Sequence, residues 1–324
     1  MLLLLALLTT ACALYRPGCS AGMEVVARGL TQPRGLAVGP DGALYAAEAG
    51  NDEIGGRVSR VRADGSRETL ATGLPHSVNA GVEDIGAAAV GFLGDQLYVL
   101  SGEAGGQLAS SLLRWRAGRL EPVADLLAVE SRLNPDNAGV ESNPFAMLPD
   151  GDAFLVVDAA GNDVLRVGAD GSAAVVAAFS DDPVPTGLAR GPDGALYLAL
   201  FGGWPHEPGR GRIERLGADG GRRTVVGGLT MPIAVAFDRG GIMHVLEFSA
   251  GLDLQPRLRF RPDSGRLLRV VGARAEVVVD GLHYPTALVV DPDGALLLAD
   301  RGAISPPASG VVLRYRSCRG IGSY

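Results

Sequence analysis

One short pattern, two strands joined by a Pro-Asp-Gly turn, recurs along this chain and limits what it can fold into. Its first copy runs from Gln32 to Glu48 and has its turn at Pro40 to Gly42. Proline presets the first position of such a turn, and glycine adopts the positive φ that a tight hairpin requires. The same turn returns at Pro192 to Gly194 and at Pro292 to Gly294. We therefore expect one repeat-built domain rather than two unrelated domains.

Alignment on the turn gives six copies, with turns about 43 to 55 residues apart, which is the span of a four-stranded propeller blade. The copies cover Pro33 to Glu48, Val82 to Glu103, Asn143 to Asp158, Pro185 to Phe201, Pro232 to Glu247 and Pro285 to Asp300. Each copy is followed by a third strand that carries an arginine, and several have a recognisable fourth strand. The sequence thus predicts an all-β, six-bladed β-propeller with four-stranded blades over residues 23–318.

The two ends of the repeat complement each other. The last copy stops after a third strand at Val311 to Tyr315, whereas Glu24 to Leu30 is typical of a fourth strand and has no copy of its own. We expect these segments to pair, because the pairing closes the ring and leaves no open sheet edge. Antiparallel pairing would bring Cys19 close to Cys318, so we expect a disulfide there, the alternative being two unpaired cysteines.

Residues 1–22 and the tail 319–324 lie outside the propeller. Leu2 to Leu8 is apolar and leads through small residues to Cys12, which is typical of an export signal that ends in a lipoprotein cleavage site. Lipidation of Cys12 would anchor the protein to a membrane. The alternatives are an ordinary signal peptide with a buried Cys12, or a later start codon. We expect an extracytoplasmic monomer, either periplasmic, held at the cell surface as a lipoprotein, or secreted.

Charge and motifs exclude several functions. The net charge is −7, the chain has no lysine, and its arginines are scattered. Without a basic cluster that could follow a phosphate backbone, nucleic acid is not an expected partner. The sequence also lacks a Gly-x-Ser-x-Gly nucleophile motif and a pair of histidines at a metal-ligand spacing.

In a propeller, the loops before the first strand and after the second strand of each blade open on one face, around the mouth of the central channel. Function is expected there. The most regular feature of this face is an acid that ends the second strand, at Glu48, Asp158, Glu247 and Asp300. Two interpretations stay open. These carboxylates bind Ca²⁺ or another divalent cation, or act in acid–base chemistry; alternatively, they are scaffold and accept hydrogen bonds from nearby backbone.

Positions that break the repeat are the other candidates. The fourth copy has Leu200 in place of the acid and continues into a loop with Trp204, His206 and Glu207, which is typical of a lid or a ligand contact. The alternative is a loop that folds over its own tryptophan. Further candidates for ligand binding at the mouth are Arg34, Glu103, Asn143, His283 and Arg301.

The whole mature chain resembles the ScyD/ScyE family of bacterial propeller proteins, which is named from a biosynthetic cluster for the pigment scytonemin. The matching segments are Pro33 to Ala37, Gly39 to Tyr45, Ser142 to Phe145, Pro185 to Ala189 and Phe201 to Arg212. The resemblance implies an NHL-like propeller and export, and it implies no catalytic residues.

The chain is also similar to the six-bladed gluconolactonase/SMP-30 group, whose members hold a divalent metal in the channel through Glu, Asn and Asp. The equivalent channel positions here are Arg34, Phe145, Thr186, Ile233 and Thr286. That ligand set therefore cannot be transferred to this chain. We expect an exported binding or accessory module that recognises a small molecule or a protein partner at the channel mouth. The alternative is a divalent-metal-dependent hydrolase or lactonase, or a lyase, that uses the channel carboxylates.

Overall fold

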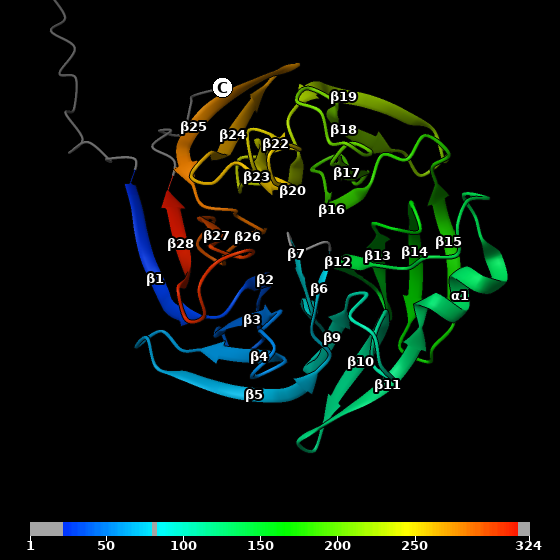
Figure 1. The fold of residues 1–324 in the computed structure, drawn as a ribbon, viewed down its shortest axis with the longest axis vertical. Helices are drawn as coiled ribbons and strands as arrows, with labels where there is room; N and C mark the ends of the chain where they lie inside the picture. The colour runs from blue at the N-terminus through cyan, green and yellow to red at the C-terminus, as the bar shows by residue number, and fades with distance from the viewer. Residues whose placement is uncertain (1–21, 80–82, 317–324) are drawn as a thin grey trace, which may run out of the picture.

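The computed structural model describes residues 22–79 and 83–316, which form six four-stranded antiparallel sheets arranged as a β-propeller (Figure 1). The expected fold is confirmed. The three cysteines, at positions 12, 19 and 318, lie outside the described residues, so their lipidation and pairing stay predictions.

The strands occupy the same four places in every blade. The first strands surround the central axis and are β2 (Pro33–Val38), β8 (Ala87–Leu93), β12 (Pro144–Asp150), β16 (Pro185–Arg190), β20 (Pro232–Phe237) and β26 (Ala287–Val290). The second strands are β3 (Leu44–Glu48), β9 (Gln96–Ser101), β13 (Ala153–Asp158), β17 (Leu196–Leu200), β21 (Met243–Glu247) and β27 (Leu296–Asp300). The third strands are β4 (Gly56–Val61), β10 (Ser111–Arg116), β14 (Asp163–Gly168), β18 (Gly211–Leu216), β24 (Gly265–Val271) and β28 (Gly310–Arg316). The outer strands are β5 (Arg67–Leu74), β11 (Arg119–Asp125), β15 (Ala173–Ala178), β19 (Arg222–Leu229), β25 (Arg274–Leu282) and β1 (Gly22–Leu30).

The ring closes as the sequence predicts. β1 pairs antiparallel with β28, with Gly22 opposite Arg316 and Val25 opposite Leu313. The N-terminal strand is thus the outer strand of the last blade, and hydrogen bonds between the two ends of the chain hold the propeller shut.

The arginines of the third strands are part of the scaffold. In blade 1, Arg60 pairs with Asp41 of the Pro-Asp-Gly turn, which also accepts a hydrogen bond from Tyr45 Oη at 3.1 Å. Blade 4 repeats the arrangement, with Arg215 Nε 2.7 Å from the Asp193 carboxylate. These pairs fasten the third strand to the turn at the end of the propeller opposite the channel mouth.

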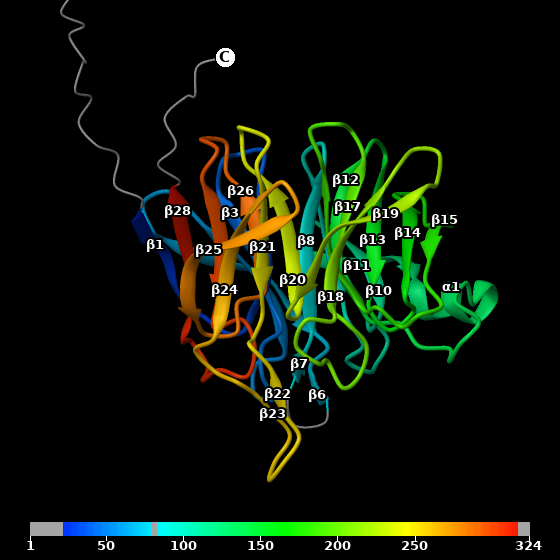
Figure 2. The same ribbon diagram turned by 90° about the horizontal axis from the view of Figure 1, so that it is seen from above.

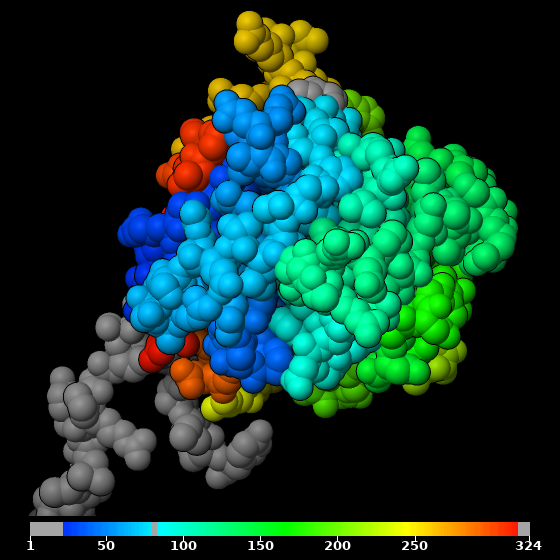
Figure 3. Space-filling view, turned by 90° about the horizontal axis from the view of Figure 1, so that it is seen from below, coloured from blue at the N-terminus to red at the C-terminus, as the bar shows by residue number. Residues whose placement is uncertain are grey.

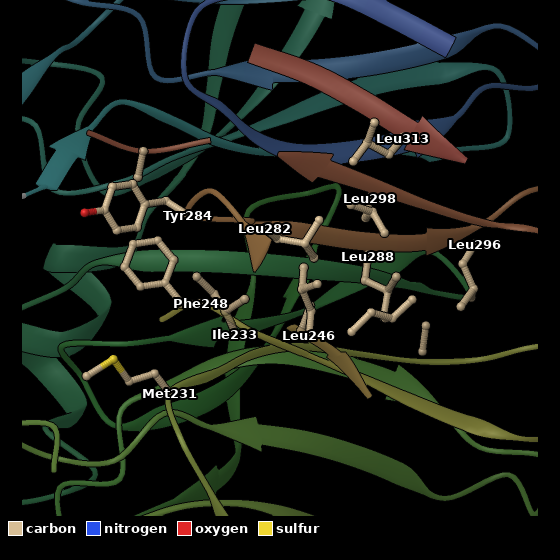
Figure 4. Close-up of a cluster of buried hydrophobic side chains, with 14 of the residues drawn as sticks. Met231, Ile233, Leu246, Phe248, Leu282, Tyr284, Leu288, Leu296, Leu298 and Leu313 are labelled. Carbon is tan, nitrogen blue, oxygen red and sulfur yellow. The ribbon is translucent and has the colours of Figure 1, made fainter. Parts of the chain in front are cut away.

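Hydrophobic side chains fill the spaces between neighbouring blades. The cluster in Figure 4 joins blades 5 and 6 through Leu246, Leu288 and Leu298, and it extends to the mouth, where the rings of Phe248 and Tyr284 stack with centroids 5.3 Å apart. The mouth loops are therefore seated on the same core that joins the blades.

Three elements were not predicted from the repeat. The helix α1 (Leu126–Leu133) follows blade 2, and Asp125 caps it by accepting the backbone N–H of Ala128 at 2.9 Å. Two short hairpins, β6 (Ser77–Asn79) with β7 (Glu83–Ile85) and β22 (Leu252–Asp253) with β23 (Arg259–Phe260), project from the mouth end (Figure 2). The blade 5 hairpin extends beyond the rest of that end (Figure 3). The described residues contain no helix long and apolar enough to cross a membrane.

Candidate functional site

The four acids that end second strands each bind the backbone at the start of their own blade. Glu48 accepts the backbone N–H of Thr31 at 2.5 Å, and Glu247 accepts that of Thr230 at 2.7 Å. Asp300 accepts the N–H of His283 at 2.8 Å in the same way. Asp158 has a shorter side chain and accepts the N–H of Asn143, one residue further along, at 2.7 Å, together with the hydroxyl of Ser142 and the N–H of Gly161. The contacts favour the scaffold interpretation.

Third-strand groups satisfy the remaining oxygens of two of these acids. Arg57 lies 2.7 Å from Glu48, whose other oxygen accepts the hydroxyl of Ser59, and Arg266 Nε lies 2.8 Å from Glu247. Burial raises the pKa of Glu247 above its ordinary value, against the opposing effect of its hydrogen bond from Thr230 and of the Arg266 charge. Burial likewise raises the pKa values of Asp158 and Asp300.

The start of blade 4 explains why Leu200 replaces the acid at the end of the second strand. The residue that corresponds to Thr31 and Thr230 is Pro183, which has no N–H to donate. An acid at position 200 would have no backbone donor to accept from, and Leu200 is instead fully buried in the core.

These acids do not assemble into a cation site. They lie in four different blades, and the described part of the chain contains no group of three or more His, Cys, Asp or Glu side chains placed to hold a metal ion.

The central channel encloses about 330 Å³ and is lined by the first strands of all six blades. Its walls are mainly Ala, Val, Leu, Ile and Phe side chains. The hydroxyl of Thr186 donates to the carbonyl of Pro232 at 2.9 Å, and that of Thr286 donates to the carbonyl of Pro33 at 2.5 Å. Both hydroxyls therefore join neighbouring blades, and the channel itself offers little polar chemistry.

A second pocket of about 100 Å³ opens at the mouth and adjoins the channel, with which it shares Arg34, Phe145, Thr186 and Ile233. It combines an aromatic wall with a few polar groups. Its polar lining comes from Arg34, Glu83, Asn143, Thr186 and His206, and its apolar lining from Phe145, Ala159, Val184, Phe201, Ile233, Phe248 and Phe260. An apolar cavity with a small number of convergent polar groups is the usual form of a small-molecule site.

His206 is the polar group most enclosed by aromatic rings in this pocket. Its ring meets Phe201 edge-on with centroids 5.1 Å apart and stacks on Phe260 at 6.3 Å, and Phe260 in turn meets Phe248 at 5.1 Å. Nδ1 of His206 lies 2.6 Å from the carbonyl oxygen of Gly202, which only accepts hydrogen bonds. Nδ1 therefore donates to this carbonyl, and in the neutral form of the ring Nε2 is an acceptor. Within the described residues, Nε2 has no hydrogen-bond partner.

Arg34 enters the pocket with its charge already paired. It is 8% exposed, its Nη2 lies 2.8 Å from the Glu83 carboxylate, and its guanidinium lies 5.0 Å from the centre of the Phe145 ring. The pocket therefore contains a compensated ion pair rather than a free cation.

Most of the predicted residues fall into two groups. Arg34, Asn143 and His206 line the mouth pocket, whereas Glu48, Asp158, Glu247 and Asp300 bind the backbone of their own blades. Trp204 contacts the ring of His206 edge-on but is 61% exposed and outside the pocket wall. Glu207 is exposed and pairs with Arg210 at 3.4 Å.

The remaining three predicted residues are not part of the pocket lining. His283 pairs with Asp263 of the blade 5 insertion at 2.7 Å, and Arg301 donates its backbone N–H to the carbonyl of His283. Glu103 is exposed and gives its backbone N–H to Asn143 Oδ1 at 3.2 Å. Desolvation of the carboxylate raises the Glu103 pKa, and the nearby charge of Glu141 adds to the effect.

Reasoning from the repeat missed the aromatic wall. Phe201, Phe248 and Phe260 were not among the candidates, although two of them lie near the ends of the longest insertion, residues 248–263. That insertion carries its aromatic rings at its base, where Tyr284 Oη donates to the carbonyl of Phe260 at 2.6 Å. Phenylalanines at both ends of a mouth insertion were the available signal.

Structural comparison places the fold among six-bladed propellers. The chain is similar to the PQQ-bound aldose sugar dehydrogenase of Streptomyces coelicolor, with 18% identity over 93% of this chain and 100% of that chain and a TM-score of 0.60. It is similar to the calcium-binding regucalcin of Agrobacterium tumefaciens, with 15% identity, 91% and 93% coverage and a TM-score of 0.60. The gluconolactonase of Xanthomonas campestris matches at 16% identity, 95% and 94% coverage and a TM-score of 0.58.

At these identities the likeness establishes the fold alone. No protein-family model matches the chain, and no curated protein matches it in sequence. Membership of the ScyD/ScyE family therefore stays a prediction.

Proposed function

We propose that this protein binds a small neutral molecule through an aromatic or similarly compact apolar group, which enters the mouth pocket and donates a hydrogen bond to His206. The observation that carries the proposal is the state of His206. Its Nδ1 is occupied by Gly202, its Nε2 is an acceptor without a partner among the described residues, and aromatic rings surround it. A half-buried acceptor that faces aromatic rings favours a ligand that supplies a donor.

Charge and size narrow the ligand further. Because Glu83 pairs with Arg34, an anionic ligand would have to compete with a carboxylate that is already in place. A cavity of about 100 Å³ suits a group near the size of one aromatic ring, and the remainder of a larger ligand would lie outside the mouth. Export to an extracytoplasmic location belongs to the same proposal and rests on the N-terminal sequence.

Ligand-observed NMR on the full chain tests the proposal with three one-ring probes. Phenol supplies the donor, toluene lacks it, and benzoate carries a negative charge. We expect phenol to bind more tightly than toluene by roughly fivefold, which corresponds to about 1 kcal/mol for one hydrogen bond, and benzoate to bind most weakly.

Two variants in one loop make the result specific to the pocket. His206→Leu places an apolar side chain at this position and removes the acceptor, so it should abolish the preference for phenol over toluene. Glu207→Gln changes an exposed neighbour that lies outside the pocket wall, and it should bind all three probes as the wild type does. Absence of saturation transfer to every probe, or an unchanged phenol preference in His206→Leu, would overturn the proposal.

A further inference from the structure

Three side chains on α1, at its C-terminus and at the start of β14 carry buried oxygen atoms without hydrogen-bond partners. Among the described residues, these atoms include Oε1 of Glu130, Oδ1 of Asn134 and both carboxylate oxygens of Asp163. Asp163 is 0% exposed and Glu130 is 3% exposed. Buried polar atoms are nearly always hydrogen-bonded in folded proteins, so these four oxygens need a physical explanation.

The three side chains come from elements that meet between blades 2 and 3. Glu130 lies on the buried face of α1, and Asn134 caps the C-terminus of the helix one turn further on, with a left-handed φ of 34°. Asp163 is the first residue of β14 and lies opposite Asp158 and Ala178 in the sheet. Figure 1 shows α1 at the outer edge of the ring, close to blade 3.

The charges of the carboxylates in this region raise the pKa values of their neighbours. Burial raises the pKa of Asp163 to about 9, and the charges of Asp158, Glu130 and Asp136 add to the rise. Burial also raises the pKa of Glu130 to about 7, with contributions from Asp136 and Asp158. The four acidic side chains are therefore close enough to repel one another.

No protein cation balances this charge. Within the described residues, none of Glu130, Asp136, Asp158 and Asp163 has an Arg or His nitrogen within 4.0 Å, although the structure contains 22 such ion-pair contacts elsewhere. The chain has no lysine to supply one. Burying unpaired carboxylates is costly, so the group must take up protons or bind a cation.

Protonation alone does not resolve the arrangement. A proton would neutralise Asp163, but one hydroxyl can satisfy at most itself and one neighbouring acceptor, so at least two of the four oxygens would still lack hydrogen-bond partners. Asp158 is different, since its oxygens already accept from Ser142, Asn143 and Gly161. A cation satisfies the unpartnered oxygens and the charge together.

We propose that Glu130, Asn134 and Asp163 bind a calcium ion that links α1 to blade 3. Carboxylate and amide oxygens are the donors that Ca²⁺ takes, and its flexible coordination by six to eight oxygens allows backbone carbonyls and water to complete the shell. The set has only two acidic ligands and one amide oxygen, and the described residues contain no group of three or more His, Cys, Asp or Glu side chains that could hold a metal ion.

The ion would also act on the mouth. The segment from Asn134 to Asn143 leads from α1 to β12, and Asn143 lines the mouth pocket. Calcium bound at Asn134 would therefore fix the C-terminus of α1, where the segment that leads to Asn143 begins. The inference does not depend on the ligand proposed for the pocket.

Calorimetric titration and thermal unfolding of the full chain, after removal of metals with a chelator, test the site directly with CaCl₂. We expect about one Ca²⁺ per chain and a Tm that rises with free calcium, because a ligand bound only by the folded state stabilises it. MgCl₂ should have a smaller effect, since Mg²⁺ demands a stricter octahedral geometry. Absence of both heat and a calcium-dependent Tm in the wild type would overturn the proposal without any variant.

Variants assign the ion to these residues. Asp163→Asn and Glu130→Gln should each weaken calcium binding by about tenfold or more, with a matching loss of the calcium-dependent rise in Tm. Asp300→Asn removes a buried acid with a raised pKa in blade 6 and should keep the full calcium response. Wild-type calcium affinity in folded Asp163→Asn and Glu130→Gln proteins would show that the ion, if bound, lies elsewhere, and would contradict the proposal.

Discussion

Glu48, at the end of β3, accepts a hydrogen bond at 2.5 Å from the backbone nitrogen of Thr31, which lies 17 residues earlier in the chain. The pair fastens the segment that enters blade 1 to the second strand of the same blade. Glu247 with Thr230 and Asp300 with His283 repeat the contact at the same separation of 17 residues. An acid at this place is thus a structural element of the blade, and the mouth residues that differ between blades are left to define function.

Removal of the Glu48 carboxylate should destabilise the propeller strongly. In Glu48→Ala, the N–H of Thr31, the hydroxyl of Ser59 and the guanidinium of Arg57 would all lose their acceptor in a buried region. We expect the free energy of unfolding to fall by about 3 kcal/mol, which is typical of breaking a buried ion pair on one side. Chemical denaturation, followed by far-UV circular dichroism, measures the loss.

Glu53→Ala is the matched control for Glu48→Ala, because Glu53 is an exposed acid in the loop that follows β3. Its free energy of unfolding should stay within about 0.5 kcal/mol of the wild type. Equal stability of the two variants would contradict a structural role for Glu48. A chelator should leave the difference of each variant from the wild type unchanged, since the contacts of Glu48 are with the protein itself.

Acid should destabilise the protein partly through His244. This side chain is 1% exposed in β21, its Nε2 lies 3.1 Å from Asp238, and burial lowers its pKa from the ordinary value of 6.5. Between the folded and unfolded pKa values the unfolded chain binds more protons, so the contribution of His244 to stability is present above pH 6.5 and is lost as pH falls below it.

A glutamine variant isolates this effect from the carboxylates. His244→Gln cannot titrate but retains a donor for Asp238. The difference in unfolding free energy between wild type and variant should therefore shrink as the pH is lowered from about 7 to about 5. Buried acids such as Glu247 act in the opposite direction but are common to both proteins. A difference that is constant across this range would contradict the assignment to His244.

The sequence predicted the architecture well because the repeat encodes it locally. The Pro-Asp-Gly turns fix one end of each blade, and the unpaired strand from Glu24 to Leu30 could only find its partner at the far end of the chain. The acids could also be identified from the sequence, but their role could not. A carboxylate that ends a strand gives the same sequence pattern whether it binds a metal or a backbone N–H. The proline at position 183 was the clue, because the blade that lacks the N–H also lacks the acid.

The candidate site was predictable only in part, because it is assembled from loops of different blades. Arg34 and His206 stood out as exceptions to the repeat, yet nothing in the sequence placed Phe260 against His206 or Glu83 against Arg34. The cluster beside α1 was hidden for the same reason. Glu130 and Asp163 belong to different elements, and their lack of partners is a property of three-dimensional packing.

Gly35 should be required because its strand, β2, packs closely against the first strand of blade 2, β8. A Cβ atom there would lie 2.5 Å from the carbonyl oxygen of Ala88 and 2.6 Å from Cα of Ala89 in blade 2, and backbone atoms cannot easily move away. We expect Gly35→Ala to lower the free energy of unfolding by about 1–3 kcal/mol, in the range of overpacked cores. Chemical denaturation measures the change.

Gly227→Ala is the control for this overpacking. The nearest atom to a Cβ at Gly227 is 3.8 Å away, so the substitution should be neutral or slightly stabilising through a less flexible unfolded chain. If both alanine variants unfold at the same denaturant concentration, the first strands of blades 1 and 2 do not pack as tightly as the structure indicates.

The closure of the ring leads to a prediction about Cys19 and Cys318. Gly22 pairs with Arg316 at the last described positions of the two strands, and both cysteines follow within a few residues outside them. We expect a disulfide between them in protein exported to an oxidising compartment. Thiol alkylation of the unfolded, unreduced chain should leave these two cysteines protected, whereas alkylation of both would contradict the prediction. Because the bond would close a loop of about 300 residues, Cys318→Ser should lower the free energy of unfolding by up to about 5 kcal/mol, and Cys12→Ser, which lies outside the loop, should not.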